Sequence, residues 1–143
     1  MKTLLQVLSD KKHKEIISIA PNRPVFDALV ILAEYKIGAL AVMEGDKLVG
    51  IFSERDYARE VILQGRSSKT TQIAEVMTAK VITGKPDDMV DKTLNLMSEK
   101  RFRHLPVLEG DKMIGMLSIG DLVKETIAYQ QRLIAGLESY IKG

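Results

Sequence analysis

The chain of 143 residues contains no cysteine and no tryptophan, and it has only two histidines. Without cysteine it cannot form disulfides, bind a metal through thiolates or use a cysteine nucleophile. The lack of cysteine also fits a reducing compartment, so we expect a cytoplasmic protein. No acid–base pair of side chains stands out in the sequence. We therefore expect a binding protein that is not an enzyme and that requires no metal.

The sequence also lacks a strong excess of either charge, and it is poor in aromatic residues. Its net charge is +2, and aromatic residues make up 5% of the chain. Surfaces that bind nucleic acid are usually much more basic and often stack bases on aromatic rings. The only local basic run, Lys11-Lys12-His13-Lys14, is diluted by Asp10 and Glu15, and we interpret it as a solvated loop. Nucleic acid is therefore an unfavoured partner.

Long hydrophobic runs are absent as well. No segment approaches the roughly 20 apolar residues that a membrane-spanning helix needs. The apolar run near the N-terminus ends at Leu8, which makes it too short for a secretory signal. The apolar share of 45% and the charged share of 28% are typical of a folded globular chain. We therefore expect no membrane partner. The length of the chain suits one compact domain or two small units.

The first half of the chain alternates predicted strands and helices. Apolar residues at helical spacing predict an amphipathic helix after Pro24, and Gly38 is expected to end it in the left-handed conformation. A glycine in the turn 44–46 predicts a hairpin. In the second helix we expect Tyr57, Ala58, Val61 and Ile62 to face inward. The expected elements are an apolar turn at 4–8, strands at 16–19, 39–43 and 48–53, and helices at 25–36 and 54–64.

The second half repeats the first. Adding 65 to a residue number maps Pro21 onto Pro86 and the turn 44–47 onto 109–112, and no gap is needed between residues 17 and 62. Before that region, Val7-Leu8-Ser9 resembles Val76-Met77-Thr78, with about four extra residues in the first copy. The expected elements are a short helix at 72–77, strands at 81–83, 104–108 and 113–118, and helices at 89–100 and from 119 onward.

This duplication predicts the fold. Each copy reads β-α-β-β-α, and one copy alone would leave a sheet face bare. We expect an α/β fold (α+β in some schemes) in which two repeats pack sheet to sheet with pseudo-two-fold symmetry. The expected boundaries are 5–65 for the first repeat, 66–75 for a linker, 76–128 for the second repeat and 129–143 for a C-terminal helical extension.

The last helix carries its own pattern. Only Gly136 interrupts its helical propensity, and apolar residues recur near heptad spacing, with Gln130 as an exception. This stripe either packs back on its own body or joins a partner helix. We favour a homodimer.

Each copy contains the pattern Gly-x-x-Ser-x-x-Asp where a strand becomes a helix. Ser53 with Asp56, and Ser118 with Asp121, have the spacing of a helix capping box. Both copies nevertheless use aspartate, and both place a glycine three residues before the serine, where the missing side chain lets something approach the strand end. A carboxylate beside the anion-binding N-terminus of a helix could hold a sugar diol next to a phosphate. The pattern therefore fits either a cap or a nucleotide site.

The two copies resemble a tandem pair of cystathionine-β-synthase (CBS) domains, often called a Bateman module. The resemblance covers roughly residues 5–128, and the chain is similar to small stand-alone bacterial proteins of this type. It depends on the residues of 50–56 and 115–121, on Arg-His-Leu-Pro-Val at 103–107, and on Val-Met-Thr at 76–78. Either heptapeptide alone would be a weak signal, but the duplicated set is specific.

The resemblance implies the roles of individual residues. In the family, the Asp binds the ribose hydroxyls and the Ser contacts ribose or phosphate, and the segment that leads into the first strand of the opposite copy reads the adenine. The site of Asp56 would thus include Ser53 and the segment from Thr78 through Lys80 to Val81. The site of Asp121 would include Ser118, with Ser9 and the region of Ile16. The residues around the Leu-Pro-Val strand complete the expected set: Arg103, His104 and Pro106.

The two expected sites differ in charge. The first copy has Arg55 where the second has Gly120, and the second has Arg103 and His104 where the first has Gly38 and Ala39. A guanidinium near a helix N-terminus can bind phosphate. The implied ligand is an adenine nucleotide such as AMP, ATP or NAD(H), and the implied role is a regulatory sensor whose dimer rearranges on binding. A nucleic-acid-binding protein and, less favoured, a small nucleotide-processing enzyme stay as alternatives.

Overall fold

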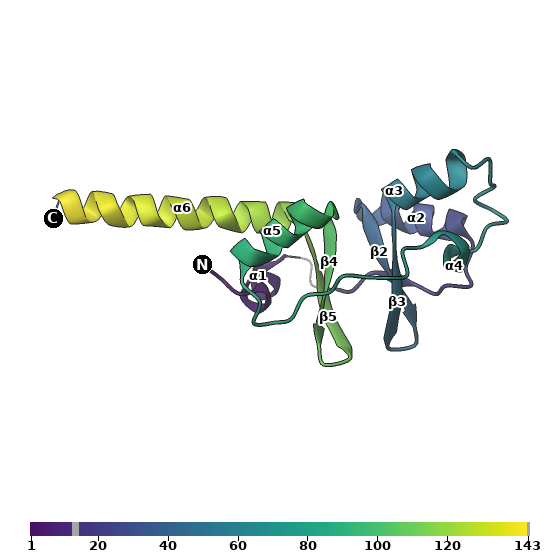
Figure 1. The fold of residues 1–143 in the computed structure, drawn as a ribbon, viewed down its shortest axis with the longest axis horizontal. Coiled ribbons are helices and arrows are strands. Elements are labelled where there is room, and N and C mark those ends of the chain that lie inside the picture. The colour runs from purple at the N-terminus through teal and green to yellow at the C-terminus, as the bar shows by residue number, and fades with distance from the viewer. Residues whose placement is uncertain (13–14, 143) are drawn as a thin grey trace. The chain divides into compact units, whose positions relative to one another are not determined.

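The computed structural model of the protein describes residues 1–12 and 15–142 (Figure 1). The chain forms two compact units. Unit 1 consists of Met1–Lys14, Thr83–Glu109 and Ile114–Gly143, and unit 2 consists of Glu15–Ile82 and Gly110–Met113. His13 and Lys14 of the basic run lie outside the described residues.

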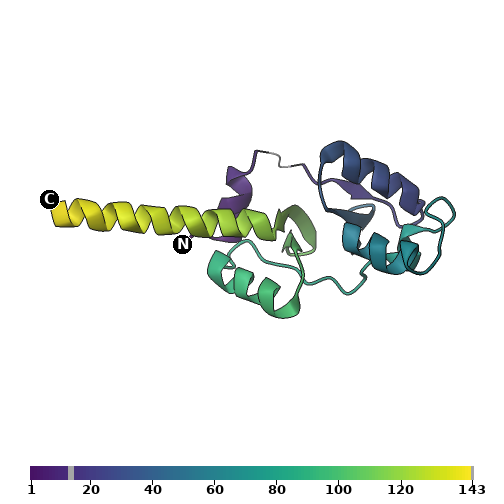
Figure 2. The same ribbon diagram turned by 90° about the horizontal axis from the view of Figure 1, so that it is seen from above.

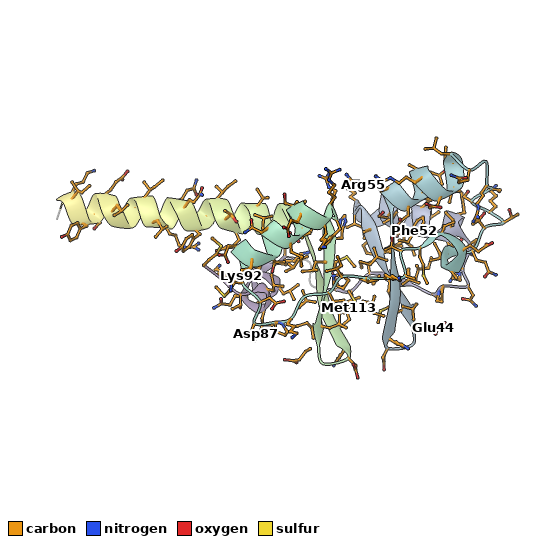
Figure 3. The ribbon with its side chains drawn as sticks, in the orientation of Figure 1. Glu44, Phe52, Arg55, Asp87, Lys92 and Met113 are labelled. Carbon is orange, nitrogen blue, oxygen red and sulfur yellow. The ribbon has the colours of Figure 1, made fainter. Side chains whose placement is uncertain are left out.

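Unit 2 holds a three-stranded sheet with helices packed on it. The strands follow the order β1-β2-β3, where β1 is parallel to β2 and β2 is antiparallel to β3. Phe52 of β3 is fully buried at the centre of the unit's core (Figure 3). The elements are β1 (Ser18–Ile19), α2 (Val25–Tyr35), β2 (Ala39–Glu44), β3 (Lys47–Ser53), α3 (Glu54–Asp56), the π-helix η1 (Tyr57–Ile62) and α4 (Ile73–Val76).

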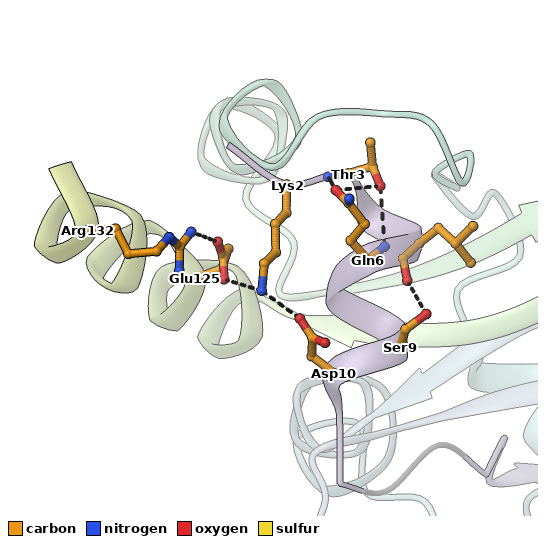
Figure 4. Close-up of polar contacts among 8 residues, drawn as sticks. Lys2, Thr3, Gln6, Ser9, Asp10, Glu125 and Arg132 are labelled. Atoms are coloured by element: carbon orange, nitrogen blue, oxygen red, sulfur yellow. Dashed lines mark hydrogen bonds and ion pairs between the residues drawn. The ribbon is translucent and has the colours of Figure 1, made fainter. Parts of the chain in front are cut away.

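Unit 1 is built on a two-stranded sheet and three helices. Its elements are α1 (Leu4–Asp10), α5 (Val90–Lys100), β4 (His104–Glu109), β5 (Lys112–Ser118) and α6 (Ile119–Lys142). Helices α1 and α5 both lie against the first part of α6 (Figure 2). Thr3 caps α1 (Figure 4). It also forms an antiparallel bridge with Met89, just before α5. Fully buried Leu4, Leu105 and Leu122 join these elements in one core.

Each of the short helices α1 and α4 packs in a different unit from the repeat that directly follows it in the chain. Helix α1 precedes the first repeat but belongs to unit 1, with the elements of the second repeat. Helix α4 precedes the second repeat but belongs to unit 2, where Ile73 and Val76 enter the core. Each repeat therefore receives the segment that leads into the other. The repeat boundaries 5–65, 66–75, 76–128 and 129–143 stay a prediction.

The expected mixed α/β fold of two repeats with an extended C-terminal helix is confirmed, and so are the hairpin turns. Gly45 and Gly110 adopt positive φ angles of 58° and 63°, which glycine tolerates at no steric cost. The prediction for Gly38 was wrong, because the left-handed residue that ends α2 is Lys36, at φ 55°. The amides of Lys36 and Ile37 both reach back to the carbonyl of Leu32, which closes the last turn before Gly38 is reached.

Two expected strands are shorter than the sequence indicated. The strand at 16–19 is reduced to β1 (Ser18–Ile19), although the carbonyl of Ile17 still accepts from Ala41 N. The expected strand at 81–83 does not form. Instead, the next residue, Gly84, makes a single parallel bridge to Val107. Gly84 N donates to Pro106 O, and Leu108 N donates to Gly84 O, so the pairing with β4 is limited to this one residue.

The helix expected at 54–64 is an α-helical turn followed by a π-helix. Leu63 N donates to Ala58 O, and Arg66 N donates to Val61 O, five residues back in both cases. The wider turn changes which residues face inward. Val61 is fully buried and Tyr57 packs on the core, but Ala58 is exposed and Ile62 is 55% exposed.

Helix α6 runs without a break through Gly136 for 24 residues. Within residues 1–12 and 15–142, no helix combines the length and the apolar character needed to cross a membrane.

Candidate functional site

Ser53 and Asp56 form a reciprocal cap at the end of β3. Ser53 N donates to Asp56 Oδ2 at 2.9 Å, and Asp56 N donates to Ser53 Oγ at 3.2 Å. The Ser53 hydroxyl lies 3.1 Å from the same carboxylate oxygen. The capping interpretation of the Ser-x-x-Asp spacing is therefore realised in unit 2. The cap uses Oδ2 of Asp56, and Oδ1 of the same carboxylate contacts a different partner.

That partner is Thr78, from the segment that follows α4. Thr78 Oγ1 donates to Asp56 Oδ1 at 3.1 Å, so the carboxylate is held on both oxygens. The backbone of Thr78 is fixed by an antiparallel bridge to Ile51, with hydrogen bonds of 2.9 and 2.8 Å in the two directions. Thr78 itself is exposed, and Asp56 is half-buried.

Gly50 explains how this segment comes so close to β3. A Cβ at Gly50 would lie 2.6 Å from Met77 Sδ and 2.9 Å from Thr78 O. Both separations are shorter than real Cβ contacts, so no side chain fits between the strand and the segment. The glycine of the Gly-x-x-Ser-x-x-Asp pattern thus allows a close approach, as expected, and the group that approaches is another part of this chain.

Ser118 and Asp121 repeat the cap at the start of α6 in unit 1. Ser118 N donates to Asp121 Oδ2 at 2.8 Å, and Asp121 N donates to Ser118 Oγ at 3.1 Å. Gly115 again allows a close approach, because its Cβ would lie 2.6 Å from Leu8 Cδ2 of α1. The two caps have the same geometry, but their outer partners differ.

The outer partner of Asp121 is Lys11. Its Nζ donates to Asp121 Oδ2 at 3.0 Å and to the carbonyl of Met116, also at 3.0 Å. Ser9 lies two residues earlier, and its hydroxyl donates to Leu5 O within α1 (Figure 4). Among the described residues, no hydrogen bond reaches Asp121 Oδ1.

Lys11 is a residue of this site that the sequence interpretation missed, because it was assigned to a solvated loop. A signal was present. The alignment of Val7-Leu8-Ser9 with Val76-Met77-Thr78 places Lys11 opposite Lys80, which was expected near the other carboxylate. The structure uses the two aligned pairs differently: the hydroxyl of Thr78 contacts Asp56, whereas the ammonium of Lys11 contacts Asp121.

The pKa of Asp121 is lowered from its ordinary value of 3.8. Partial burial acts in the opposite direction and raises it. The hydrogen bonds from Ser118 N and from Lys11, together with the charge of Lys11, outweigh that effect. Asp121 therefore stays a carboxylate, which accepts hydrogen bonds.

Replacing Lys11 by methionine is expected to lower the free energy of unfolding by about 0.5–1 kcal/mol near neutral pH. Because the folded-state pKa of Asp121 lies below its ordinary value of 3.8, the carboxylate stabilises the fold above that value. This contribution is lost as the pH falls through the folded-state pKa. Urea unfolding of both proteins at about pH 7 and about pH 3 should show the difference shrinking at the lower pH. The exposed neighbour Lys12, replaced in the same way, is the control. An equal loss at both pH values would contradict the ion pair.

The remaining expected residues of unit 1 lie near the start of α6 or in β4. Arg103 is exposed, and its carbonyl accepts from Ile119 N at 2.8 Å, which places its backbone beside the cap of Asp121. His104 is half-buried at the start of β4. Pro106 is buried within β4, and its carbonyl accepts from Gly84 N. Arg103 is thus joined through its backbone to the first turn of α6.

The remaining expected residues of unit 2 are more peripheral. Arg55 is exposed in α3, next to Asp56 in the sequence (Figure 3). Lys80 and Ile16 are exposed, and Val81 is half-buried. In the described part of the chain, no hydrogen bond or ion pair connects Arg55, Lys80 or Ile16 to either carboxylate. Likewise, no group of three histidine, cysteine or acidic side chains gathers there in a way that could hold a metal.

The duplicated geometry agrees with the comparison with known families. The CBS domain matches the chain twice, at residues 9–63 and 73–127. This chain belongs to the CBS domain family. The two matches include both carboxylates and their caps, together with Lys11 and Thr78.

Two relatives indicate how widely this pair occurs. The CBS domain-containing protein CBSX3, mitochondrial, of Arabidopsis thaliana is 41% identical over 124 residues, which cover 83% of this chain and 60% of that protein. The solved structure of a putative signal-transduction protein with CBS domains from Burkholderia ambifaria MC40-6 is 50% identical and superposes with a TM-score of 0.86. That match covers 89% of this chain and 95% of the Burkholderia chain.

A third similar structure contains ligands. The CBS domain pair of protein MJ0100 was solved in complex with 5′-methylthioadenosine and S-adenosyl-L-methionine. It is 26% identical to this chain, has a TM-score of 0.78, and the match covers 90% of this chain and 98% of that one. Both ligands of MJ0100 contain an adenosine group.

Proposed function

We propose that this CBS pair is a regulatory module that binds adenine nucleotides and catalyses no reaction. The observation that carries the proposal is the duplicated carboxylate at a helix start, held by its own cap and by one further polar side chain. The adenosine ligands of the related MJ0100 pair support the choice of ligand class. AMP, ATP and NAD(H) are the nucleotides to test.

The carboxylates suit a ribose because they accept hydrogen bonds in pairs. Oδ2 of each Asp receives the cap, so Oδ1 is the atom for a ribose hydroxyl. At Asp121 this oxygen accepts no bond from the described residues. At Asp56 it accepts from Thr78 Oγ1, a hydroxyl that can rotate to donate elsewhere. A cis diol would then replace or join the Thr78 bond.

The outer partners suggest that the two sites differ in the ligand charge they prefer. Lys11 places an ammonium group beside Asp121, and the N-terminus of α6 adds its partial positive charge. This site suits an anionic nucleotide, since a phosphate could take over the Lys11 bond. Thr78 gives the site of Asp56 a neutral partner, and the exposed Arg55 precedes Asp56 directly in α3. We therefore propose that binding at the Asp121 site depends on the phosphate of the nucleotide.

The proposed output is a change of arrangement and not a chemical reaction. A ligand shifts a conformational equilibrium only by its difference in affinity between the states. Replacing the Lys11–Asp121 and Thr78–Asp56 bonds would alter how α1 and the segment after α4 are held. We propose that a homodimer of the chain transmits this change to a protein partner.

The first test is to identify what the purified protein retains and binds. Mass spectrometry of a denatured sample should release an adenine nucleotide, and calorimetry with AMP, ATP and NAD(H) should give saturable binding. A ligand at 100 times its Kd would stabilise the fold by about 2.7 kcal/mol, seen as a rise in Tm. The nucleotide should be recovered unchanged after incubation. Neither retention nor binding of any of the three would overturn the proposal, and a converted nucleotide would point to an enzyme.

A further inference from the structure

The C-terminal half of α6 carries apolar side chains that nothing in its own unit covers. Figures 1 and 2 show α6 continuing beyond α1 and α5, with no other segment alongside. Every residue from 130 to 142 is exposed. The large apolar residues exposed on this helix are Val123, Ile127, Leu133, Ile134, Leu137, Tyr140 and Ile141.

One face of α6 is already used inside unit 1. Leu122 is fully buried, and Glu125 is 9% exposed. Glu125 Oε1 accepts from Arg132 Nη2 at 2.7 Å, and Oε2 lies 3.6 Å from Lys2 Nζ (Figure 4). These contacts fix the side of α6 that faces its own body. At 3.6 residues per turn, Ile127, Ile134 and Ile141 lie about 100–140° around the helix from Leu122, on a face that these contacts leave uncovered.

The stripe has the spacing of a two-helix seam. Ile127, Ile134 and Ile141 follow one another at intervals of seven, and Val123, Gln130 and Leu137 do the same in between. In heptad terms the isoleucines occupy position a, and the other three occupy position d. From Val123 to Ile141 the seam is about 27 Å long, at about 1.5 Å per residue. Five of its six positions are apolar, which is the pattern of a helix that pairs with another helix.

The charges beside the seam favour one direction of pairing. Position e holds Lys124 near one end and Glu138 near the other, and both are exposed. In an antiparallel pair, e positions face e positions, so Lys124 of each helix meets Glu138 of the other. In a parallel pair, e faces g, where Leu133 would meet Glu138 and neither charge would find an opposite one. Only the antiparallel register gives two ion pairs.

We propose that a second copy of this chain covers the stripe, and that the two α6 helices form an antiparallel coiled coil. This inference rests on the homodimer of the proposed function but not on its ligand. In the matching register, Val123 packs against the partner's Ile141, and Ile127 packs against the partner's Leu137. Leu133 lies beside its own counterpart at the centre. The first turns of the two α6 helices then lie at opposite ends of the seam.

The first experiment compares oligomeric state for two matched double variants. Sedimentation of the unchanged chain at micromolar concentration should give a dimer. Ile134→Glu with Leu137→Glu places charge in the seam and should give a folded monomer, checked by circular dichroism and thermal unfolding. Ala135→Glu with Ser139→Glu adds the same charge on positions away from the seam and should leave the dimer intact. A monomeric parent, or a dimer that survives the seam variant, overturns the proposal.

A charge exchange tests the direction. Glu138→Lys alone sets lysine against Lys124 at both ends and should weaken the dimer roughly tenfold in Kd. Lys124→Glu combined with Glu138→Lys should restore the affinity, because the pairs re-form with their signs exchanged. A double variant as weak as the single one would exclude the antiparallel register.

Because the chain has no cysteine, single cysteines report the pairing directly. Two chains of different mass, one with Ile127→Cys and one with Leu137→Cys, are mixed and oxidised. The antiparallel seam predicts the mixed disulfide as the main product, whereas a parallel seam predicts each chain linked to its own kind. Calorimetry with nucleotide on the monomeric seam variant separates this proposal from the proposed function, since binding there should persist.

Discussion

Alanine at Gly50 is expected to lower the free energy of unfolding by about 1–3 kcal/mol, the usual cost of forcing a group into a packed site. The added Cβ would lie 2.9 Å from the backbone oxygen of Thr78 and 2.6 Å from Met77 Sδ. A side-chain end can rotate away, but the Thr78 oxygen cannot, because it accepts the hydrogen bond from Ile51 N. The bridge between β3 and the segment after α4 must therefore open or shift.

The same substitution should also damage the site in unit 2. Thr78 reaches Asp56 only because its backbone is fixed on β3. We expect weaker nucleotide binding at Asp56 in the Gly50→Ala protein, while the site of Asp121 keeps its affinity. Chemical denaturation measures the stability, and calorimetry measures the binding.

Gly136 provides the matched control for Gly50. It lies within α6, and a Cβ there meets nothing within 4 Å. Gly136→Ala should stabilise the helix by about 0.5–1 kcal/mol, since alanine has the higher helix propensity and less freedom when unfolded. Opposite signs at the two glycines would support the close approach at Gly50. A Gly50→Ala protein as stable as its parent would show that the segment after α4 does not pack on β3 as described.

Replacing both Asp56 and Asp121 by alanine is expected to abolish nucleotide binding. Each replacement removes a carboxylate that the proposed ribose contact requires, and two hydrogen bonds to a charged acceptor correspond to a loss of at least about 100-fold in Kd per site. The single variants should lose one site each. Calorimetry of the parent, both single variants and the double variant gives the number of sites and their affinities.

The loss of the helix caps must be separated from the loss of the ligand contact. Each aspartate also accepts a hydrogen bond from the serine three residues earlier, so alanine should cost about 1 kcal/mol in stability. Asn at both positions keeps a capping oxygen but loses the charge. It should restore most of the stability without restoring binding.

Asp46 and Asp111 are the control for these substitutions. They are exposed, and they occupy equivalent positions in the two hairpin turns. Alanine there changes the net charge by the same amount and should leave binding unaltered. Parent-like affinity in the Asp56 and Asp121 double variant would contradict the proposed ribose contacts.

The duplication determined most of what the sequence could predict. The constant offset of 65 residues between the copies predicted the hairpin glycines, the Ser-x-x-Asp caps and the order of the long elements. All of these are present in the structure. Such features depend on local chemistry, because turns need particular φ angles and caps need particular spacings. The resemblance to the CBS family followed from the same residues and is confirmed.

Other features depended on packing between distant segments. The pairing of Lys11 with Asp121 joins residues 110 positions apart, and sequence reasoning assigned Lys11 only to a charged loop. The single bridge at Gly84 and the π-helix of η1 are also choices of backbone hydrogen bonding that local propensity does not encode.

The tertiary structure also decided what the two motif glycines do and where the two short helices belong. By itself the sequence determined a tandem CBS pair with two capped carboxylates and a long, striped final helix. Only the tertiary structure placed α1 in unit 1 and α4 in unit 2, and filled the space at Gly50 and Gly115 with Met77, Thr78 and Leu8. The physical reason is that the hydrogen bonds of a cap join residues only three positions apart in the chain. A close contact at a glycine requires a segment that is distant in the sequence to pack against it.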